Sequence, residues 1–355
     1  MPIRVGLIGL GEVAQLMHLP LLADDPRFSV DAIMDVSPSL LAFVGKRYGV
    51  ARRYESAQAL LADPTIDAVF ILTPDHLHAI LLAQAMDAGK HVFIEKPVCL
   101  TAAELAPLLP RAAGYAQTVF VGYMRRFSRP FLELQRRLPP AGEIIHARFR
   151  DLICEAPFFI RQTRLVFAPT DVPATVVAEG RRETERLLRS VVGADATREQ
   201  LRAYQVLTGL SSHSFAAMRE LLGMPLRVVA AVQHGGERVV ALFDYGHFTT
   251  VYEAVIHNVA RFDAGIEILT DRRRFAMNYD TPYIRNLPTQ LEITDSTDEE
   301  TRTDIVGPVY EDPFRIELDA FHTCIQTGAT PKTSLRDAAR DLELFAMVAK
   351  AFTAA

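Results

Sequence analysis

Apolar runs alternate with helical segments along the first ~125 residues of the chain. The runs typical of buried strands cover residues 3–8, 30–35, 68–73, 91–94 and 118–123. Segments with helical apolar spacing lie between them, one from Glu12 onward and one over residues 77–88. Continuous apolar strands that alternate with helices are typical of a parallel sheet covered on both faces. The pattern predicts a doubly wound α/β domain over residues 1–125.

The pattern changes after about residue 140, where strands follow one another without helices between them. A strand is expected over residues 143–151, and later strands over residues 228–233, 238–245, 248–257, 266–270 and 275–278. Consecutive strands joined by short turns predict a large open sheet that is mainly antiparallel. Residues 157–208 are rich in Arg, Glu and Ala and predict a helical insert. Its role is open between a lid and an oligomer contact. The acidic run 295–304 is most simply a solvated loop.

The last segment of the chain has a helical period. Ala338, Leu342, Phe345, Ala349 and Phe352 recur at spacings of four and three residues, which places them on one face of a helix. The sequence therefore predicts a closing amphipathic helix over residues 335–355.

Length and charge narrow the classes of function. A chain of 355 residues favours two domains. A net charge of −5 gives no basic surface for nucleic acid or an anionic membrane, and no apolar run is long enough to span a bilayer. The three cysteines lie far apart without the spacing of a metal site. We therefore expect a cytoplasmic protein without a bound metal.

A glycine-rich motif follows the first apolar run directly and precedes a helical stretch. It reads Gly9-Leu10-Gly11-Glu12-Val13-Ala14, the G-x-G-x-x-G/A pattern of dinucleotide-binding proteins. Gly9 permits the tight turn, Gly11 lets a pyrophosphate approach the backbone, and Ala14 lets the helix pack close to the strand. The helix N-terminus supplies N–H groups for the phosphates.

Asp35 ends the second apolar run, 24 residues beyond Gly11. A carboxylate at this place bonds the ribose diol of NAD and repels the 2′-phosphate of NADP. The sequence therefore favours NAD over NADP. The alternative interpretation, that Asp35 is an incidental surface aspartate, stays open.

These residues, taken together, resemble the Gfo/Idh/MocA oxidoreductase family of glucose–fructose oxidoreductase, inositol dehydrogenase and their relatives. The resemblance rests on the glycine motif, Asp35, and the stretches "TPDHLHA" (73–79), "AGKHVFIEKP" (88–97) and "GYMRRF" (122–127), and it extends to the C-terminal residues 314–338. It implies an N-terminal Rossmann domain, residues 1–125, onto which the helix 335–355 packs back. Residues 126–334 are then the substrate-binding α/β domain, whose open sheet often forms an oligomer interface in this family.

The resemblance also implies site residues at the end of the run 91–94. Lys96-Pro97 is expected to be a cis peptide, with Lys96 beside the nicotinamide and the substrate hydroxyl as the proton-transferring group. Glu95 is as easily a local hydrogen-bond partner as a functional residue. The remaining residues assigned to the cofactor are Thr73, Pro74, His76, His78 and Pro97. His76 and His78 resemble a zinc pair only superficially, since they have no carboxylate or cysteine partner nearby in sequence.

A second site is where the sequence departs from the family. Many relatives carry Asp-x-Gly-x-His at a helix start in the second domain, with Asp and His near the reacting carbon. The matching residues here are Gly209, Leu210, Ser211, Ser212 and His213, so that the histidine is kept and the aspartate is not. Lys96 and His213 can suffice for proton transfer, another acid can replace the missing one, or the chain is not a standard dehydrogenase.

Tyr123 and Arg126 follow the last strand of the first domain. They either hydrogen-bond the substrate or pack between domains.

The sequence predicts an NAD(H)-dependent oxidoreductase that acts on a hydroxyl carbon of a sugar, inositol or related polyol. Lys96 and His213 are its catalytic candidates, and together with Tyr123 and Arg126 they are its substrate-binding candidates. One alternative is a relative that uses bound NAD for elimination or hydrolysis without net oxidation, and another is a nucleotide-binding regulator without turnover. The expected partners are a small-molecule substrate and further copies of the chain, as a dimer or tetramer through the C-terminal sheet.

Overall fold

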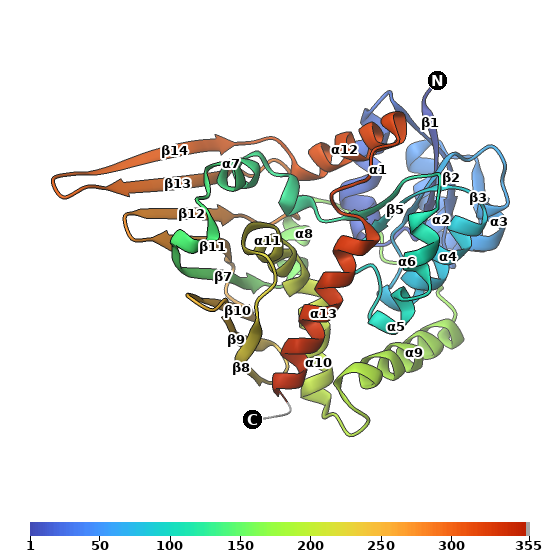
Figure 1. The fold of residues 1–355 in the computed structure, drawn as a ribbon. Helices are drawn as coiled ribbons and strands as arrows, with labels where there is room; N and C mark the ends of the chain where they lie inside the picture. Colours follow the sequence, from blue (N-terminus) through green and yellow to red (C-terminus); the bar gives the residue numbers. More distant parts are fainter. Residues whose placement is uncertain (353–355) are drawn as a thin grey trace. The chain divides into compact units, whose positions relative to one another are not determined.

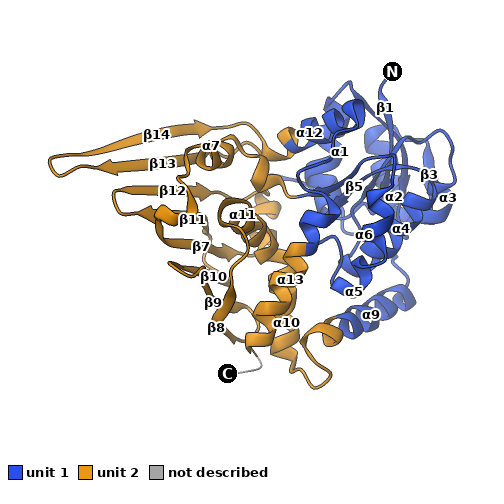
Figure 2. Cartoon of the chain, viewed as in Figure 1, with its two compact units in different colours: residues 1–122, 164–187, 317–339 blue, residues 123–163, 188–316, 340–355 orange. Residues whose placement is uncertain are grey.

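The computed structural model describes residues 1–352, which form two compact units (Figure 2). Unit 1 contains residues 1–122, 164–187 and 317–339. Unit 2 contains residues 123–163, 188–316 and the chain from Arg340 onward. The predicted division after residue 125 lies three residues from the observed one. The assignment of cofactor binding to one unit and substrate binding to the other stays a prediction.

Unit 1 is built on a six-stranded sheet with the order β3-β2-β1-β4-β5-β6 (Figure 1). Every neighbouring pair of strands is parallel. The strands are β1 (Ile3–Ile8), β2 (Phe28–Met34), β3 (Arg52–Tyr54), β4 (Ala68–Ile71), β5 (His91–Glu95) and β6 (Val119–Gly122). The strand order reverses at β1, from which the chain builds outward in both directions. The predicted doubly wound parallel sheet is confirmed.

Helices connect these strands, and two of them begin at a residue whose side chain caps the helix. Ser37 accepts a hydrogen bond from the Leu40 amide at the start of α2, with Pro38 as its first residue. Thr101 accepts one from the Glu104 amide at the start of α5. The helical elements up to β6 are the π-helical turn η1 (Ala14–His18), α1 (Leu19–Asp24), α2 (Pro38–Tyr48), α3 (Ala57–Leu61), the 3₁₀ turn η2 (Asp75–Leu77), α4 (His78–Asp87), α5 (Ala102–Leu105) and α6 (Leu108–Ala113).

A cluster of phenylalanine rings fills one face of the parallel sheet. Phe93 stacks on Phe70 and Phe120 with ring centroids 4.7 and 5.5 Å apart. Phe321 of α12 (Pro313–Thr327) meets the edges or faces of all three rings at 5.6 to 5.7 Å. A backbone hydrogen bond from the Val121 amide to the Thr333 carbonyl adds to this attachment. Residues far along the chain therefore complete the core of unit 1.

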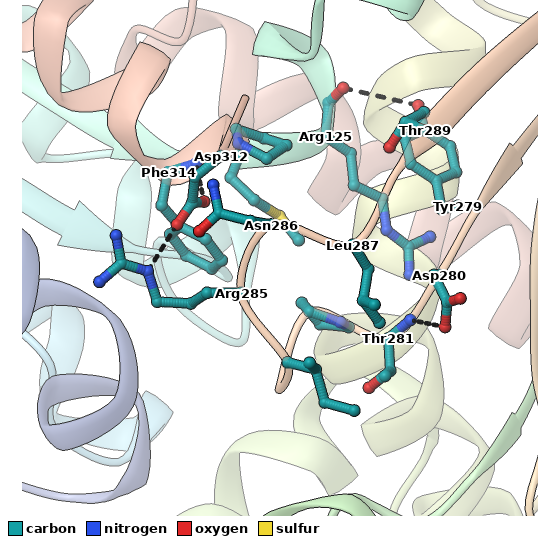
Figure 3. A pocket seen from close by; sticks show the side chains of 14 residues that line it. Arg125, Tyr279, Asp280, Thr281, Arg285, Asn286, Leu287, Thr289, Asp312 and Phe314 are labelled. Atoms are coloured by element: carbon teal, nitrogen blue, oxygen red, sulfur yellow. Dashed lines mark hydrogen bonds and ion pairs between the residues drawn. The ribbon is translucent and has the colours of Figure 1, made fainter. Parts of the chain in front are cut away.

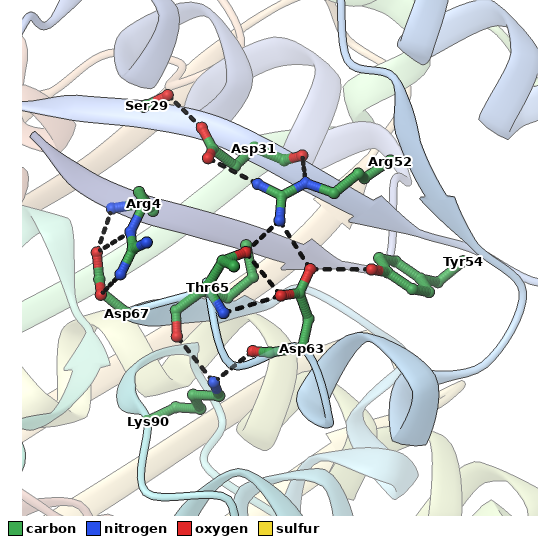
Figure 4. A network of polar contacts seen from close by, with 10 residues as sticks. Arg4, Ser29, Asp31, Arg52, Tyr54, Asp63, Thr65, Asp67 and Lys90 are labelled. Atoms are coloured by element: carbon green, nitrogen blue, oxygen red, sulfur yellow. Dashed lines mark hydrogen bonds and ion pairs between the residues drawn. The ribbon is translucent and has the colours of Figure 1, made fainter.

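Ion pairs close the amino-terminal edge of the same sheet (Figure 4). Arg4 donates to both carboxylate oxygens of Asp67. Lys90 is buried and donates to the carbonyl oxygens of Asp63 and Ile66 at 2.7 and 2.8 Å. Burial lowers the pKa of Lys90. The lysine of the "AGKHV" stretch is therefore a structural residue that holds the loop before β4.

Unit 2 contains an eight-stranded sheet with the order β14-β13-β12-β11-β7-β10-β9-β8. Only β7 and β10 pair in parallel, so the predicted mainly antiparallel sheet is confirmed. The strands are β7 (Ile144–Cys154), β8 (Arg227–His234), β9 (Arg238–Asp244), β10 (Thr249–His257), β11 (Phe262–Thr270), β12 (Arg273–Tyr279), β13 (Thr289–Ser296) and β14 (Thr301–Val309). The helical elements before α12 are η3 (Met124–Phe127), α7 (Arg129–Arg137), η4 (Ala141–Glu143), α8 (Ala156–Thr163), α9 (Ala174–Val192), α10 (Arg198–Val206), η5 (Leu207–Ser211) and α11 (Ser212–Leu222).

The expected loop at residues 295–304 is wrong, because this run forms the end of β13, a turn and the start of β14. Almost every residue of β14 is exposed, so the strand lacks the alternation of apolar and polar residues that would reveal it. Backbone pairing with β13 holds it in place.

The last helix, α13 (Leu335–Phe352), buries the predicted stripe of apolar residues. Ala338 and Phe345 are 0 and 1% exposed, and Phe345 stacks on Phe215 within unit 2. The part of α13 up to residue 339 groups with unit 1 and the remainder with unit 2. Residues 353–355 of the predicted helix lie outside the described residues.

A buried carboxylate in unit 2 joins three elements. Asp151 of β7 is fully buried and lies 2.6 Å from the guanidinium of Arg125 in η3. It also accepts hydrogen bonds from Ser214 of α11 and Tyr252 of β10 at 2.6 and 3.0 Å. Burial, followed by the charge of Asp151, raises the pKa of Tyr252, which therefore stays a neutral donor. This network fixes the start of α11, the helix that carries His213.

Asp151→Ala should lower the free energy of unfolding by about 3–5 kcal/mol, because it leaves the Arg125 guanidinium buried without its counter-charge. Asp263→Ala is the matched control, since Asp263 pairs with Arg150 on the same sheet but is partly exposed, and it should cost less than about 1 kcal/mol. Urea unfolding of both variants, followed by circular dichroism, measures the difference. Equal losses of stability would contradict this account.

Candidate functional site

The glycine motif forms the turn between β1 and η1. Gly9 has a φ of +91°, and a Cβ there would lie 2.8 Å from the carbonyl oxygen of Leu72. At Gly11 a Cβ would meet nothing within 4 Å, and the residue is exposed. Ala14 is completely buried. The turn therefore offers open backbone at Gly11, where a pyrophosphate can approach, and no side chain fills that space.

Asp35 links this turn to the helix after β2. Its carboxylate accepts hydrogen bonds from the amides of Leu10 and Ser37 at 2.9 and 3.0 Å. Each carboxylate oxygen keeps further lone pairs, which can accept the hydroxyl groups of a ribose. The residues present thus fit a dinucleotide, with Gly11 at the phosphates and Asp35 at the ribose. Glu12 and Val13 form the exposed and half-buried rim of the turn.

The register of the sheet aligns the ends of its strands. Ile8 pairs with Met34 and Ile71, and Ile71 pairs with Ile94. The next residues along the four strands, which include Gly9 and Asp35, therefore lie at one edge. Ligands of open parallel sheets bind at this carboxyl edge, next to the point where the strand order reverses.

Strand β5 ends at this edge with Glu95, and the cis peptide expected between Lys96 and Pro97 is confirmed. Lys96 is half-buried, while Glu95 and Pro97 on either side of it are buried. The Lys96 amide donates to the Glu95 carboxylate at 3.2 Å. The backbone therefore places Lys96 directly after β5, at the carboxyl edge of the sheet.

His18 is a site residue that sequence reasoning missed. Its Nε2 lies 2.8 Å from the Glu95 carboxylate, and both side chains are buried. The imidazole packs against Phe70 and Phe93. The only signal in the sequence is its position four residues after Ala14, on the same helical face. The pair ties the helix after the glycine motif to the strand that ends in Lys96.

His78 joins the loops after β4 and β5. Its ring nitrogens lie 2.7 Å from the Pro97 carbonyl oxygen and 2.8 Å from that of Thr73. His76 lies apart from this contact, with Nδ1 3.3 Å from the Thr184 hydroxyl, and burial lowers its pKa. Among residues 1–352 no group of three or more His, Cys, Asp or Glu is placed to hold a metal ion.

Tyr123 and Arg126, both in unit 2, are buried. The Arg126 guanidinium forms an ion pair with Glu220 of α11 and lies 5.6 Å from the centre of the Tyr123 ring. In this structure both side chains serve internal contacts, and their assignment to a substrate stays a prediction.

His213 is the second residue of α11 and is half-buried. Gly209, at the position of the family aspartate, lies in the π-helical turn η5 before it. A Cβ at Gly209 would meet nothing within 4 Å, so the space for a larger side chain is present.

A cavity of about 40 Å³ lies in unit 2 beside Arg125, Tyr279 and Asp312 (Figure 3). The guanidinium of Arg125 lies 5.1 Å from the Tyr279 ring centre, and Arg285 donates to Asp312 at 2.8 Å. Pockets for small molecules usually measure about 300–1,000 Å³, so this cavity has room for water and not for a sugar.

Residues 3–123 match the family described as "Oxidoreductase family, NAD-binding Rossmann fold", under the name GFO_IDH_MocA. The myo-inositol 2-dehydrogenase of Thermotoga maritima is 31% identical over 134 residues, which are 37% of this chain and 39% of the relative. The NAD⁺-dependent scyllo-inositol 2-dehydrogenase of Bacillus subtilis is 30% identical over 142 residues, which are 40% of this chain and 41% of the relative. The chain thus matches about two fifths of the length of these relatives.

The fold of the whole chain also matches a solved structure. A 3-ketoreductase from Actinomadura kijaniata, solved with NADP and TDP-benzene, superposes with a TM-score of 0.72 at 19% identity, over 100% of this chain and 98% of that one. None of the helices in the described residues is long and apolar enough to cross a bilayer. The family match covers the dinucleotide-binding part of the chain, so residues 3–123 are similar to the Gfo/Idh/MocA family of oxidoreductases.

Proposed function

We propose that this protein is an NAD(H)-dependent oxidoreductase acting on a hydroxyl carbon of a sugar, an inositol or a related polyol. The observation that carries the proposal is the position of Lys96, which follows β5 at the same sheet edge as Gly11 and Asp35. The inositol dehydrogenases among the relatives support the substrate class.

A bound nicotinamide supplies the acceptor or donor of hydride. The chain supplies the proton chemistry, because the Lys96 amine can take the proton of a substrate hydroxyl or return it to a carbonyl oxygen. The buried Glu95–His18 pair holds the end of β5 and so positions Lys96. His213 keeps its predicted role as a second proton-transfer residue. The side chains of Thr73 and Pro74 belong to the turn that His78 holds, and we assign this turn to the cofactor as well.

Asp35 favours NAD over NADP in this proposal. Its carboxylate is fixed by two amides and carries a negative charge where a 2′-phosphate would add more.

Lys96→Ala should lower kcat by about 10²–10⁴-fold, because the proton-transferring amine is lost. Affinity for NAD should change little, since the phosphates and ribose are held by backbone and Asp35. Absorbance at 340 nm, with NAD or NADP and a panel of inositols, aldoses and uronates, measures turnover. Lys46→Ala, at an exposed lysine of α2, is the control and should keep full activity.

A variant Lys96→Ala as active as the native protein would refute the catalytic assignment.

The open space at Gly209, where the family aspartate is absent, favours a second candidate function. The protein would then either oxidise and re-reduce the same substrate or act as a regulator without turnover. Native protein that binds NAD but forms no NADH with any member of the panel would favour that second candidate.

We further propose a cytoplasmic homo-oligomer that assembles through the eight-stranded sheet. Ile305 within β14 and Tyr310 directly after it are exposed, which leaves apolar surface on this part of unit 2.

Light scattering coupled to size exclusion should give a mass of two or four chains of 39.5 kDa. Ile305→Arg should shift that mass toward one chain, because it places a charge in the interface. A native mass of one chain at micromolar concentration would refute the oligomer.

A further inference from the structure

The segment 164–187, here called the strap, comes from the predicted insert yet groups with unit 1 (Figure 2). Its first contact is with the helix after the glycine motif. The Gln15 side chain donates to the Phe167 carbonyl at 3.0 Å and accepts from the Phe167 amide at 2.9 Å. The same Gln15 amide donates to the Leu10 carbonyl at 3.0 Å. The strap is therefore joined through Gln15 to the turn that carries the glycines.

The second contact of the strap lies along α2. The Phe167 ring stacks on Phe43 with centroids 4.7 Å apart and an interplanar angle of 19°. Asp171 follows four residues later and reaches the start of the helix. Its carboxylate accepts hydrogen bonds from the Ser37 hydroxyl, the Ser39 amide and the Ser39 hydroxyl, the last two at 2.8 Å.

The third contact is with the loop after β4. Within α9, a Cβ on Gly180 would lie 3.0 Å from the His76 ring, and the Thr184 hydroxyl lies 3.3 Å from His76 Nδ1. The strap thus touches the segments that follow β1, β2 and β4. It runs along the carboxyl edge of the sheet, where a dinucleotide would lie.

We propose that Asp171 is a second specificity residue for the cofactor, a negative charge that the strap places at the start of α2 to exclude a 2′-phosphate. This inference rests on the proposed binding of NAD. It goes beyond the role of Asp35, because it assigns part of the discrimination between NAD and NADP to the insert.

The argument comes from what a 2′-phosphate needs. In dinucleotide-binding folds the ribose hydroxyls lie at the end of β2, beside Asp35, and a 2′-phosphate would extend toward the residues that follow. Here those residues are Ser37 and Ser39, whose hydroxyls and amide are the donors an anion would use. Asp171 already takes these donors and adds its own charge.

The charge of Asp171 is present at neutral pH. The hydrogen bonds from Ser37 and Ser39 lower the pKa of Asp171 to about 2. Because the pKa is lowered by the contact, the contact is favoured above the ordinary pKa of the carboxyl and is lost as the pH falls through about 2.

The test measures dissociation constants of the full chain for NAD⁺ and NADP⁺ by isothermal titration calorimetry. Asp171→Asn keeps the shape and the acceptor oxygen of the side chain but removes its charge. We expect NADP⁺ to bind about tenfold tighter than to the native protein, since a like charge is gone, and NAD⁺ to bind within about threefold of native. Glu179→Gln is the matched control, because it removes an exposed acid of the same strap and should leave the ratio of the two constants unchanged.

One result would overturn the inference while NAD binding stands: an Asp171→Asn protein in which the ratio of the dissociation constants for NAD⁺ and NADP⁺ equals that of the native protein. If both constants change by the same factor, Asp171 is an anchor of the strap only. Native protein that binds neither dinucleotide would refute the proposed function itself, and the inference with it.

Discussion

Parallel pairing of β1 with β2 on one side and β4 on the other is the constraint on which the rest of unit 1 depends. It brings the ends of separate strands into one row, so that Gly9 and Asp35, 26 positions apart, become neighbours along an edge. The site is therefore set by backbone hydrogen bonds, and side chains only refine it. Ion pairs at the opposite edge, such as Arg4 with Asp67, hold the other ends of the strands.

A buried carboxylate with a polar partner anchors each of the two elements proposed to carry proton chemistry. Glu95 with His18 holds the end of β5 in unit 1, and Asp151 with Arg125 holds the start of α11 in unit 2. Burying charges costs free energy that the pairing barely offsets, so apolar residues would give comparable or greater stability. We infer that these buried contacts are useful because they orient the end of β5 and the start of α11. A buried carboxylate with several hydrogen bonds restricts the orientation of the groups around it.

The sequence could predict the features that depend on residues close together in the chain. Strands buried on both faces show as apolar runs, and Gly9, Asp35 and Lys96 lie within local motifs, so these strands and these site residues were predictable. Strand β14 was not, because pairing with β13 rather than burial holds it. The contacts of His18 with Glu95 and of Arg125 with Asp151 join residues 77 and 26 positions apart. Nothing in such a residue's neighbours in sequence indicates a distant partner.

The corner at the start of α2 shows how an insertion can reuse a site that the fold already offers. Ser37 serves two acids at once, its amide donating to Asp35 and its hydroxyl to Asp171. Two carboxylates so close repel each other, and each is tolerated because amides and the positive end of the helix dipole face it. A 2′-phosphate at this helix start would meet the same dipole. The Ser37 and Ser39 donors, however, already bond Asp35 and Asp171, whose two negative charges would repel it. A fold that binds anions at helix starts thereby becomes selective, with no change in the strands that build it.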